Sequence, residues 1–280
     1  MNETTSSINT NFDKPSSQPA FYIPHGGGPC FFMDWEPSNL WNGMEAFLKS
    51  IDTRLPEHPK AILLISAHWQ EANFSVTTNP EPALIYDYYG FPEHTYKLKY
   101  PAKGAPALAK RIVSLLRTAG LSSQEDAIRG FDHGMFIPLM LMFPKADIPV
   151  VQLSLRNDLN PQAHIKAGQA LAHLREEGIL IVGSGMSFHN MAAYGNSKYS
   201  AASKEFDTWL TTTVEASIPK MKAELALWYE APSALDSHPL GSEEHLIPLM
   251  VVAGTARKER GRKVYSEQIY TNQVSAFMFK

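Results

Sequence analysis

The sequence is poor in cysteine, in surplus positive charge and in long apolar runs. Cys30 is the single cysteine, so no disulfide can form within the chain and a reducing compartment, the cytoplasm, is expected. Lys and Arg number 25 against 28 Asp and Glu, a net charge of −3, which lacks the basic surplus that nucleic-acid binding requires. No apolar stretch reaches the roughly 18 to 20 residues that span a bilayer. We therefore expect neither a nucleic acid nor a membrane as a partner.

The composition that remains is that of an ordinary globular protein. Hydrophobic residues make up 44% and charged residues 19% of 280 positions, which is enough apolar material for one large core. Residues 1–19 are rich in Ser, Thr, Asn and Pro and predict a flexible tail, because they offer little surface to bury. No repeat or linker divides the rest, so residues 20–280 are predicted to form one domain.

Short apolar runs alternate with amphipathic segments along this domain. Apolar runs bounded by turn residues predict strands buried on both faces, at 21–23, 61–65, 149–155 and 179–182. Helical periodicity and end signals predict helices at 105–119, 161–177, 200–229 and 242–253, and residues 264–279 predict a terminal strand or hairpin. This alternation predicts an α/β fold: a central, mostly parallel, twisted sheet flanked by helices.

Histidines follow three of the predicted strands. His25 comes directly after 21–23, His68 shortly after 61–65 and His189 shortly after 179–182. Ligands bind at the carboxyl edge of open parallel sheets, because the loops there converge on one crevice. A single histidine at a strand end is usually structural, but three in equivalent positions indicate one shared site. His245, in the first turn of the predicted helix 242–253, and His133 are further candidates.

Other conspicuous residues carry weaker signals. His164 and His173 lie nine residues apart rather than at the i,i+4 spacing of a helical metal pair, so we expect them at the surface. The three glycines after His25 match neither a dinucleotide-binding nor a P-loop pattern, and predict either a close backbone approach or a tight turn. Apolar residues follow Cys30 directly, which favours a buried thiol over a nucleophile.

Six motifs, taken together, resemble those of the class III extradiol ring-cleaving dioxygenases, in the branch typified by DOPA dioxygenase. They occur in the order PHGGG, LISAHW, YDYYGFP, FDHGMFIPL, GSGMSFHN and EEHLIPLMVVAG, between about Tyr22 and Ala256. The resemblance implies a single α/β domain with one non-haem metal ion. It implies Fe(II) for activity, with Zn(II) as another occupant of such folds.

The same resemblance assigns roles to the histidines. It implies that His25, His68 and His245 bind the metal, that His189 is the acid/base over the substrate and that His133 is a second polar group in the pocket. More distant members of the class complete the site with a glutamate, so Glu244 competes with His245 as the third ligand. We favour His245, with Glu244 supporting the ligand or capping the helix that follows.

The reaction implied is oxygen-dependent extradiol cleavage of a small, DOPA-like catechol. Histidine titrates in the range needed to take a proton from a catechol hydroxyl. Tyr89 and Phe91, in the aromatic segment, are candidates to stack on the substrate ring, although such a segment also occurs as a surface loop packed on the core.

Two other classes of function remain open at this point. A zinc hydrolase could use the same three histidines and an activated water, with His189 or Glu244 as the base. A non-catalytic binding protein could keep the pocket and lose the ligands. The presence of all four histidines assigned as ligands or acid/base, His25, His68, His189 and His245, disfavours the binding protein.

Overall fold

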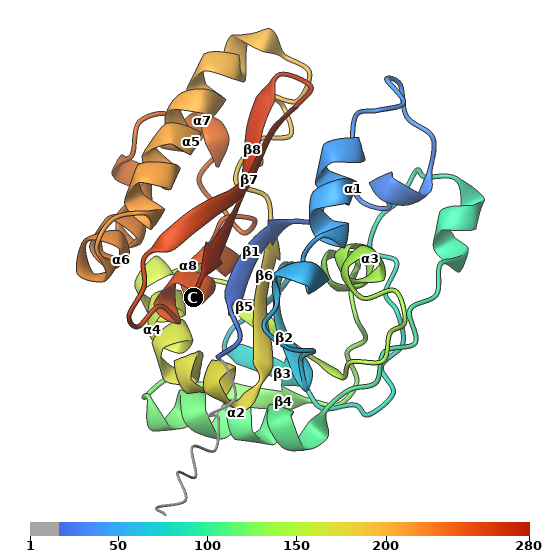
Figure 1. Ribbon diagram of the computed structural model, residues 1–280, viewed down its shortest axis with the longest axis vertical. Coiled ribbons are helices and arrows are strands. Elements are labelled where there is room, and N and C mark those ends of the chain that lie inside the picture. Colours follow the sequence, from blue (N-terminus) through green and yellow to red (C-terminus); the bar gives the residue numbers. More distant parts are fainter. Residues whose placement is uncertain (1–16) are drawn as a thin grey trace, which may run out of the picture.

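The computed structural model describes residues 17–280 and places their strands in one sheet with helices on both faces (Figure 1). The strands are β1 (Ala20–Pro24), β2 (Ala61–Glu71), β3 (Phe74–Thr77), β4 (Ser123–Asp126), β5 (Val150–Arg156), β6 (Ile179–Gly185), β7 (Gly261–Ile269) and β8 (Asn272–Phe279). The predicted tail lies outside the described residues up to position 16. Gln18 is already buried and donates its backbone N–H to the Arg175 carbonyl, so the packed chain starts slightly before position 20.

The strand order explains why several loops meet at one edge. Within residues 17–280 it is β4-β3-β5-β2-β6-β1-β8-β7. The central strands β5, β2, β6 and β1 pair in parallel, whereas the hairpin β7–β8 joins β1 antiparallel and β3 joins β5 antiparallel. The mostly parallel α/β sheet predicted from the sequence is confirmed. The carboxyl ends of β1, β2 and β6 lie side by side.

Helices cover the two faces of this sheet. They are α1 (Asn42–Lys49), α2 (Pro106–Thr118), α3 (His133–Met142), α4 (Pro161–Leu171), α5 (Ser200–Val214), α6 (Ile218–Ala226), α7 (Ala234–Ser237) and α8 (Ile247–Gly254). Helices α1 and α3 lie on one face, and α2, α4 and α8 lie on the other, with α5 and α6 beside the terminal hairpin (Figure 1). None of the described helices is both long and apolar enough to cross a bilayer.

The core forms because alternate residues of the central strands point to opposite faces. In β1, Phe21 and Ile23 pack with α1 and α3, whereas Ala20 and Tyr22 pack with the helices of the other face. Strands buried on both sides need apolar residues at every position, which is why they appear as short continuous apolar runs in the sequence.

Three predicted boundaries are wrong, and two of them concern the site. Strand 61–65 continues to Glu71, so His68 lies inside β2 and not beyond it. The helix predicted from 242 begins only at Ile247, so His245 lies in the preceding loop and not in a first turn. The predicted helix 200–229 is divided, because Pro219 in the first turn of α6 cannot continue the hydrogen-bond ladder of α5.

Candidate active site

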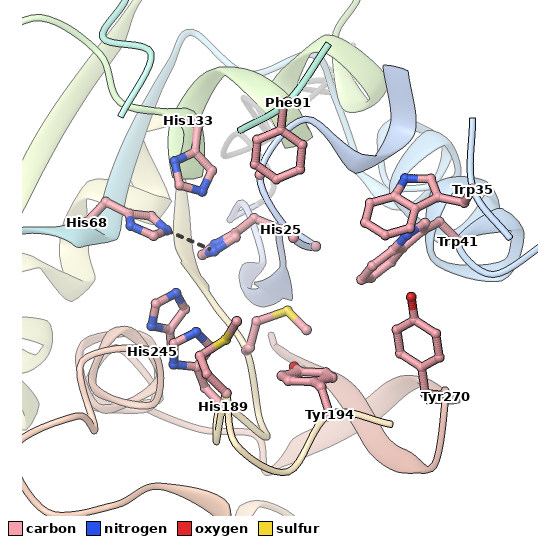
Figure 2. Close-up of a pocket in the computed structure, with 15 residues that line it drawn as sticks. His25, Trp35, Trp41, His68, Phe91, His133, His189, Tyr194, His245 and Tyr270 are labelled. Carbon is pink, nitrogen blue, oxygen red and sulfur yellow. Dashed lines mark hydrogen bonds between the residues drawn. The ribbon is translucent and has the colours of Figure 1, made fainter. Parts of the chain in front are cut away.

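Five histidines gather at the carboxyl edge of the sheet (Figure 2). His25 follows β1, His68 lies in β2, His133 begins α3, His189 follows β6 and His245 precedes α8. They surround the inner end of a cavity of about 320 Å³, whose lining is His25, Gly26, Gly27, Gly28, Trp35, Trp41, His68, Phe91, His133, Met186, His189, Met191, Tyr194, His245 and Tyr270. The convergence predicted from the strand ends is therefore present.

Hydrogen bonds fix the protonation pattern of the His25 ring. Its Nδ1 lies 3.0 Å from Ser184 Oγ. Because the Ser184 hydroxyl donates to the Gly134 carbonyl, it accepts from His25 and Nδ1 carries the proton. The unprotonated Nε2 is left facing the other histidines. The second nitrogen of a metal-binding histidine is usually held in this way.

A local irregularity in β2 positions His68. The register between β2 and β5 shifts between Ile65 and Gln70, and such bulges change the direction of a side chain near an active site. A Cβ at Gly134 would lie 2.9 Å from His68 Cδ2, so only glycine at that position leaves room for the ring. The result places His68 Nε2 3.1 Å from His25 Nε2.

His245 is held by both its backbone and its ring. Its carbonyl accepts hydrogen bonds from Tyr22 Oη at 2.7 Å and from the Met186 N–H at 3.1 Å. A Cβ at Gly185 would lie 2.0 Å from that carbonyl oxygen, which explains the second glycine of the GSG motif. The ring Nδ1 lies 2.7 Å from Glu244 Oε1, so Nδ1–H donates to the carboxylate and Nε2 remains unprotonated.

His25, His68 and His245 together fit a single metal ion. Their ligand atoms all lie within 4.8 Å of one another. A separation of 3.1 Å between two Nε2 atoms suits ligands that are each about 2.0 to 2.2 Å from the same ion. Burial, reinforced by the neighbouring histidines, holds the pKa values of His25 and His245 well below the usual value and lowers the pKa of His68 to about 3. All three are therefore neutral near pH 7, the form that binds metals.

Two further groups of potential ligands overlap this one. Each shares a histidine with it, and each contains a carboxylate that already lies close to a ring Nδ1: His68 with Asp87 and His133, and His189 with Glu244 and His245. The carboxylates therefore orient histidines. Glu244 Oε1 lies 2.7 Å from His245 Nδ1, on the opposite side of the ring from Nε2.

His189 and His133 adjoin the three-histidine group from different sides. The His189 ring stacks on His245, with ring centroids 3.4 Å apart and an interplanar angle of 17°. Burial lowers the pKa of His189 to about 4, so its imidazole is neutral near pH 7. His133 donates both its backbone N–H and its ring Nδ1–H to Asp87 Oδ1, each at 2.9 Å. The other ring nitrogen of His133, Nε2, is left available to a molecule in the pocket.

The aromatic residues of the pocket differ from those expected. Phe91 lines it, but the side chain of Tyr89 is 91% exposed and does not, so the expected stacking role of Tyr89 is wrong for this structure. The neighbouring Tyr88 takes the inward direction and packs in the core, and adjacent side chains of an extended segment point to opposite sides. Sequence reasoning missed four aromatic residues of the lining, which come from distant loops: Trp35, Trp41, Tyr194 and Tyr270.

Residues 19–278 match the family described as the catalytic LigB subunit of aromatic ring-opening dioxygenase. The chain belongs to this family. It is 41% identical over 244 residues to a 4,5-DOPA dioxygenase extradiol of Beta vulgaris, covering 84% of this chain and 86% of the relative. It is 37% identical over 273 residues to the dioxygenase tasH of Hapsidospora irregularis, covering 89% and 82%. A crystal structure of an uncharacterized Escherichia coli K12 protein superposes with a TM-score of 0.74 at 28% identity, covering 94% of this chain and 100% of that one.

Membership of the LigB family settles the class of the protein. It is an enzyme, an extradiol dioxygenase that opens aromatic rings, and the resemblance stated from the sequence motifs is confirmed. Enzymes of this family depend on a metal, and the three-histidine group could bind one. Their reaction implies a small aromatic substrate and oxygen.

Proposed function

We propose that His25, His68 and His245 hold one metal ion, Fe(II) in the active enzyme, and that the protein cleaves a small catechol beside its two hydroxyls. The observation that carries this proposal is the pair of fixed tautomers. Ser184 and Glu244 each hold an Nδ1–H, so His25 and His245 present unprotonated Nε2 atoms to one point at the inner end of the cavity. Several relatives are named 4,5-DOPA dioxygenase, which makes DOPA the reference substrate.

The donor set suits this chemistry. Three neutral nitrogen ligands leave coordination positions open for a substrate, and imidazole accepts both Fe(II) and Zn(II). When bound, Fe(II) supplies the electrons for oxygen activation and its charge lowers the pKa of the catechol hydroxyls. No observation on the structure or on the relatives favours a zinc hydrolase or a non-catalytic binding protein.

His189 is the residue that we assign to accept the catechol proton. Its imidazole is neutral near pH 7 and borders the cavity, stacked on one of the metal ligands. The carboxylate of Glu244 lies 3.5 Å from His189 Nδ1, where it stabilises the positive charge that the ring gains with the proton. One carboxylate therefore supports both the ligand His245 and the base His189.

His133 is assigned as the second polar group beside the substrate. Because Asp87 holds its Nδ1–H, the ring is fixed with Nε2 as the nitrogen available to a hydroxyl or to oxygen. Phe91 forms an apolar wall of the same cavity and limits the access of water to the reacting ring.

The test is anaerobic reconstitution with Fe(II), followed by addition of oxygen and a panel of catechols that includes DOPA, protocatechuate and unsubstituted catechol. We expect one oxygen consumed for each catechol, together with a yellow ring-opened semialdehyde. An absence of oxygen uptake across the panel, combined with oxygen-independent ester or amide hydrolysis by the Zn(II) form, would overturn the proposal. His25→Ala protein, treated identically, is the control for iron bound elsewhere.

A further inference from the structure

The cavity has a second end that the proposed chemistry does not use. Away from the histidines its walls are aromatic: Trp35 and Trp41 on one side, Tyr270 and Tyr194 on another and Phe91 on a third (Figure 2). Trp35 and Trp41 meet edge to face, with ring centroids 5.7 Å apart. A catechol whose diol lies among the histidines extends its opposite ring carbons into this end.

The outer end offers no countercharge for an ionic substituent. Among the residues that line the cavity in the described chain there is no Asp, Glu, Lys or Arg. The indole N–H of Trp35 donates to the Cys30 carbonyl and the Tyr194 hydroxyl donates to the Phe188 carbonyl, so these polar atoms are already paired. The nearby carboxylates, Asp87 and Glu244, are bound to histidines at the other end. The indole N–H of Trp41 has no hydrogen-bond partner within the described residues and is a neutral donor, but an ionic substituent would still lose its hydration there without a countercharge.

The glycines after His25 make the floor of this aromatic end. A Cβ at Gly28 would lie 2.9 Å from the Phe91 ring, and one at Gly27 would lie 3.7 Å from the Trp41 ring. Gly28 also has a φ of +56°, which side chains disfavour. Gly28 therefore lets the Phe91 ring approach the backbone near His25, whereas Gly27 would tolerate a Cβ beside Trp41, and the two glycines add an apolar surface next to the histidines.

Tyr270 is held at the cavity by an unfavourable backbone conformation. It is the first residue of the two-residue turn between β7 and β8, and its φ is +52°. Glycine or asparagine is favoured at such a position, and a bulky residue there is an outlier that points to a role for its side chain. That side chain is 43% exposed and lines the cavity, so it contributes to the site and little to the core.

We propose that the outer end, formed by Trp35, Trp41, Phe91, Tyr194 and Tyr270, selects catechols that carry an uncharged, apolar or aromatic substituent opposite the diol. This inference rests on the proposed function, because that function places the diol among the histidines. It assigns to this enzyme a substrate class that differs from the zwitterionic DOPA in the names of several relatives. Tyr270, which lines the cavity at a positive φ, is assigned as the specificity-determining residue.

The first experiment compares four catechols of similar size that differ in charge. They are 4-propylcatechol (neutral), 3,4-dihydroxyphenylpropanoate (anionic), dopamine (cationic) and DOPA (zwitterionic). Binding to Fe(II)-loaded protein is measured by calorimetry without oxygen, and kcat/KM is then measured with oxygen. We expect 4-propylcatechol to bind and react about tenfold or more better than each charged analogue. Equal or better binding of any charged analogue would overturn the inference, and better binding of dopamine would indicate a cation–π cage instead.

The outcomes separate this inference from the proposed function. If the neutral catechol binds best but no catechol is cleaved, the proposed reaction fails and the selectivity stands. If all four are cleaved with equal kcat/KM, the reaction stands and the selectivity fails.

Two variants test the residues directly. Tyr270→Gly should keep or raise the thermal midpoint, because glycine favours the observed φ, and should weaken the binding of 4-propylcatechol more than the binding of unsubstituted catechol. Met191→Arg places a guanidinium at a lining position that is 70% exposed and should improve binding of the propanoate. Tyr229→Ala, at a tyrosine 47% exposed and outside the cavity, is the matched control. An unchanged preference in Tyr270→Gly protein, or no gain with Met191→Arg, would contradict the assignment.

Discussion

The two ends of the cavity are built in different ways. At the histidine end three of the five rings are fixed by a hydrogen bond at Nδ1: Ser184 holds His25, Glu244 holds His245 and Asp87 holds His133. At the aromatic end the side chains come from loops and from a hairpin turn, and several remain partly exposed.

The difference follows from what each end must do. A metal site needs donors whose tautomer and direction are set before the ion arrives, and hydrogen bonds to the second ring nitrogen set both. A wall that selects substituents needs shape and the absence of charge. Loops can change such a wall without disturbing the donors, so the same reaction can be given to different substrates.

Removing a proposed metal ligand should produce the largest effect. We expect His25→Ala to lose stoichiometric metal and to abolish ring cleavage, because His68 and His245 alone leave the ion without its third nitrogen. Metal analysis after Fe(II) reconstitution checks this, with oxygen uptake measured in parallel. Full metal content in this variant would show that the ion is bound elsewhere. The histidine end could then no longer be contrasted with the aromatic end as the metal site.

Removing the base should separate binding from turnover. His189→Ala should retain metal, while turnover falls by about 10² to 10⁴, the usual scale for a lost general acid or base. The His189 ring stacks on His245 but is not needed to complete the three-histidine group. Metal loss in this variant would make His189 a ligand, and unchanged turnover would remove it from the mechanism.

Changing a residue that hydrogen-bonds a proposed metal ligand should have a smaller effect than removing the ligand itself. Glu244→Gln keeps an acceptor for His245 Nδ1–H but removes the charge, so we expect metal affinity to fall by about 10- to 100-fold. Ser184→Ala removes the corresponding acceptor for His25 Nδ1–H, and we expect its metal affinity to fall by a similar factor. Competition with a chelator measures both. If Glu244→Gln lost metal as completely as His25→Ala, the carboxylate itself would be the ligand.

The histidine end was largely predictable from the sequence because strands carry local signals. Buried parallel strands appear as apolar runs, and His25 and His189 follow two of these strands, whereas His68 follows the apolar run 61–65 but lies inside β2. His133 and His245 were also candidates from the sequence, but only the family motifs gave them roles, because no local pattern indicates their convergence with the other three. Missed elements such as β3 and β4 have only four residues each and pair with distant strands, so their signal is tertiary.

The aromatic end could not be predicted in the same way. Trp35 and Tyr270 lie more than two hundred positions apart, and they meet only because the β7–β8 hairpin pairs with β1. Tyr89 looked equivalent to Phe91 in the sequence, and only the direction of the folded loop distinguishes them. Positive φ at Tyr270 has no sequence signal, because a tyrosine is not the residue expected there.

His164 is a buried histidine that lies outside the cavity, and it can be compared with the cavity histidines. Sequence reasoning placed His164 at the surface, but it is fully buried on α4, with Phe74 against its ring. Its Nδ1–H donates to the Asn160 carbonyl at 2.7 Å, and its Nε2 accepts the Arg156 N–H at 3.1 Å. The neutral ring thus satisfies both neighbours, and a protonated ring could not accept the second bond.

The pH dependence of stability should reveal this histidine. Burial lowers the pKa of His164 from 6.5 in the unfolded chain to about 4, so its contribution to stability is full above pH 6.5 and is lost as the pH falls towards 4. The loss reaches up to about 3 kcal/mol. In metal-free protein, His164→Gln should show a flatter fall in the free energy of unfolding between pH 6.5 and 4.5 than the unaltered chain, measured with urea. The difference between the two proteins removes the contribution of the cavity histidines, and His173→Gln, at a partly exposed site, is the control. Parallel curves for His164→Gln and the unaltered protein would show that the buried ring is not penalised when protonated.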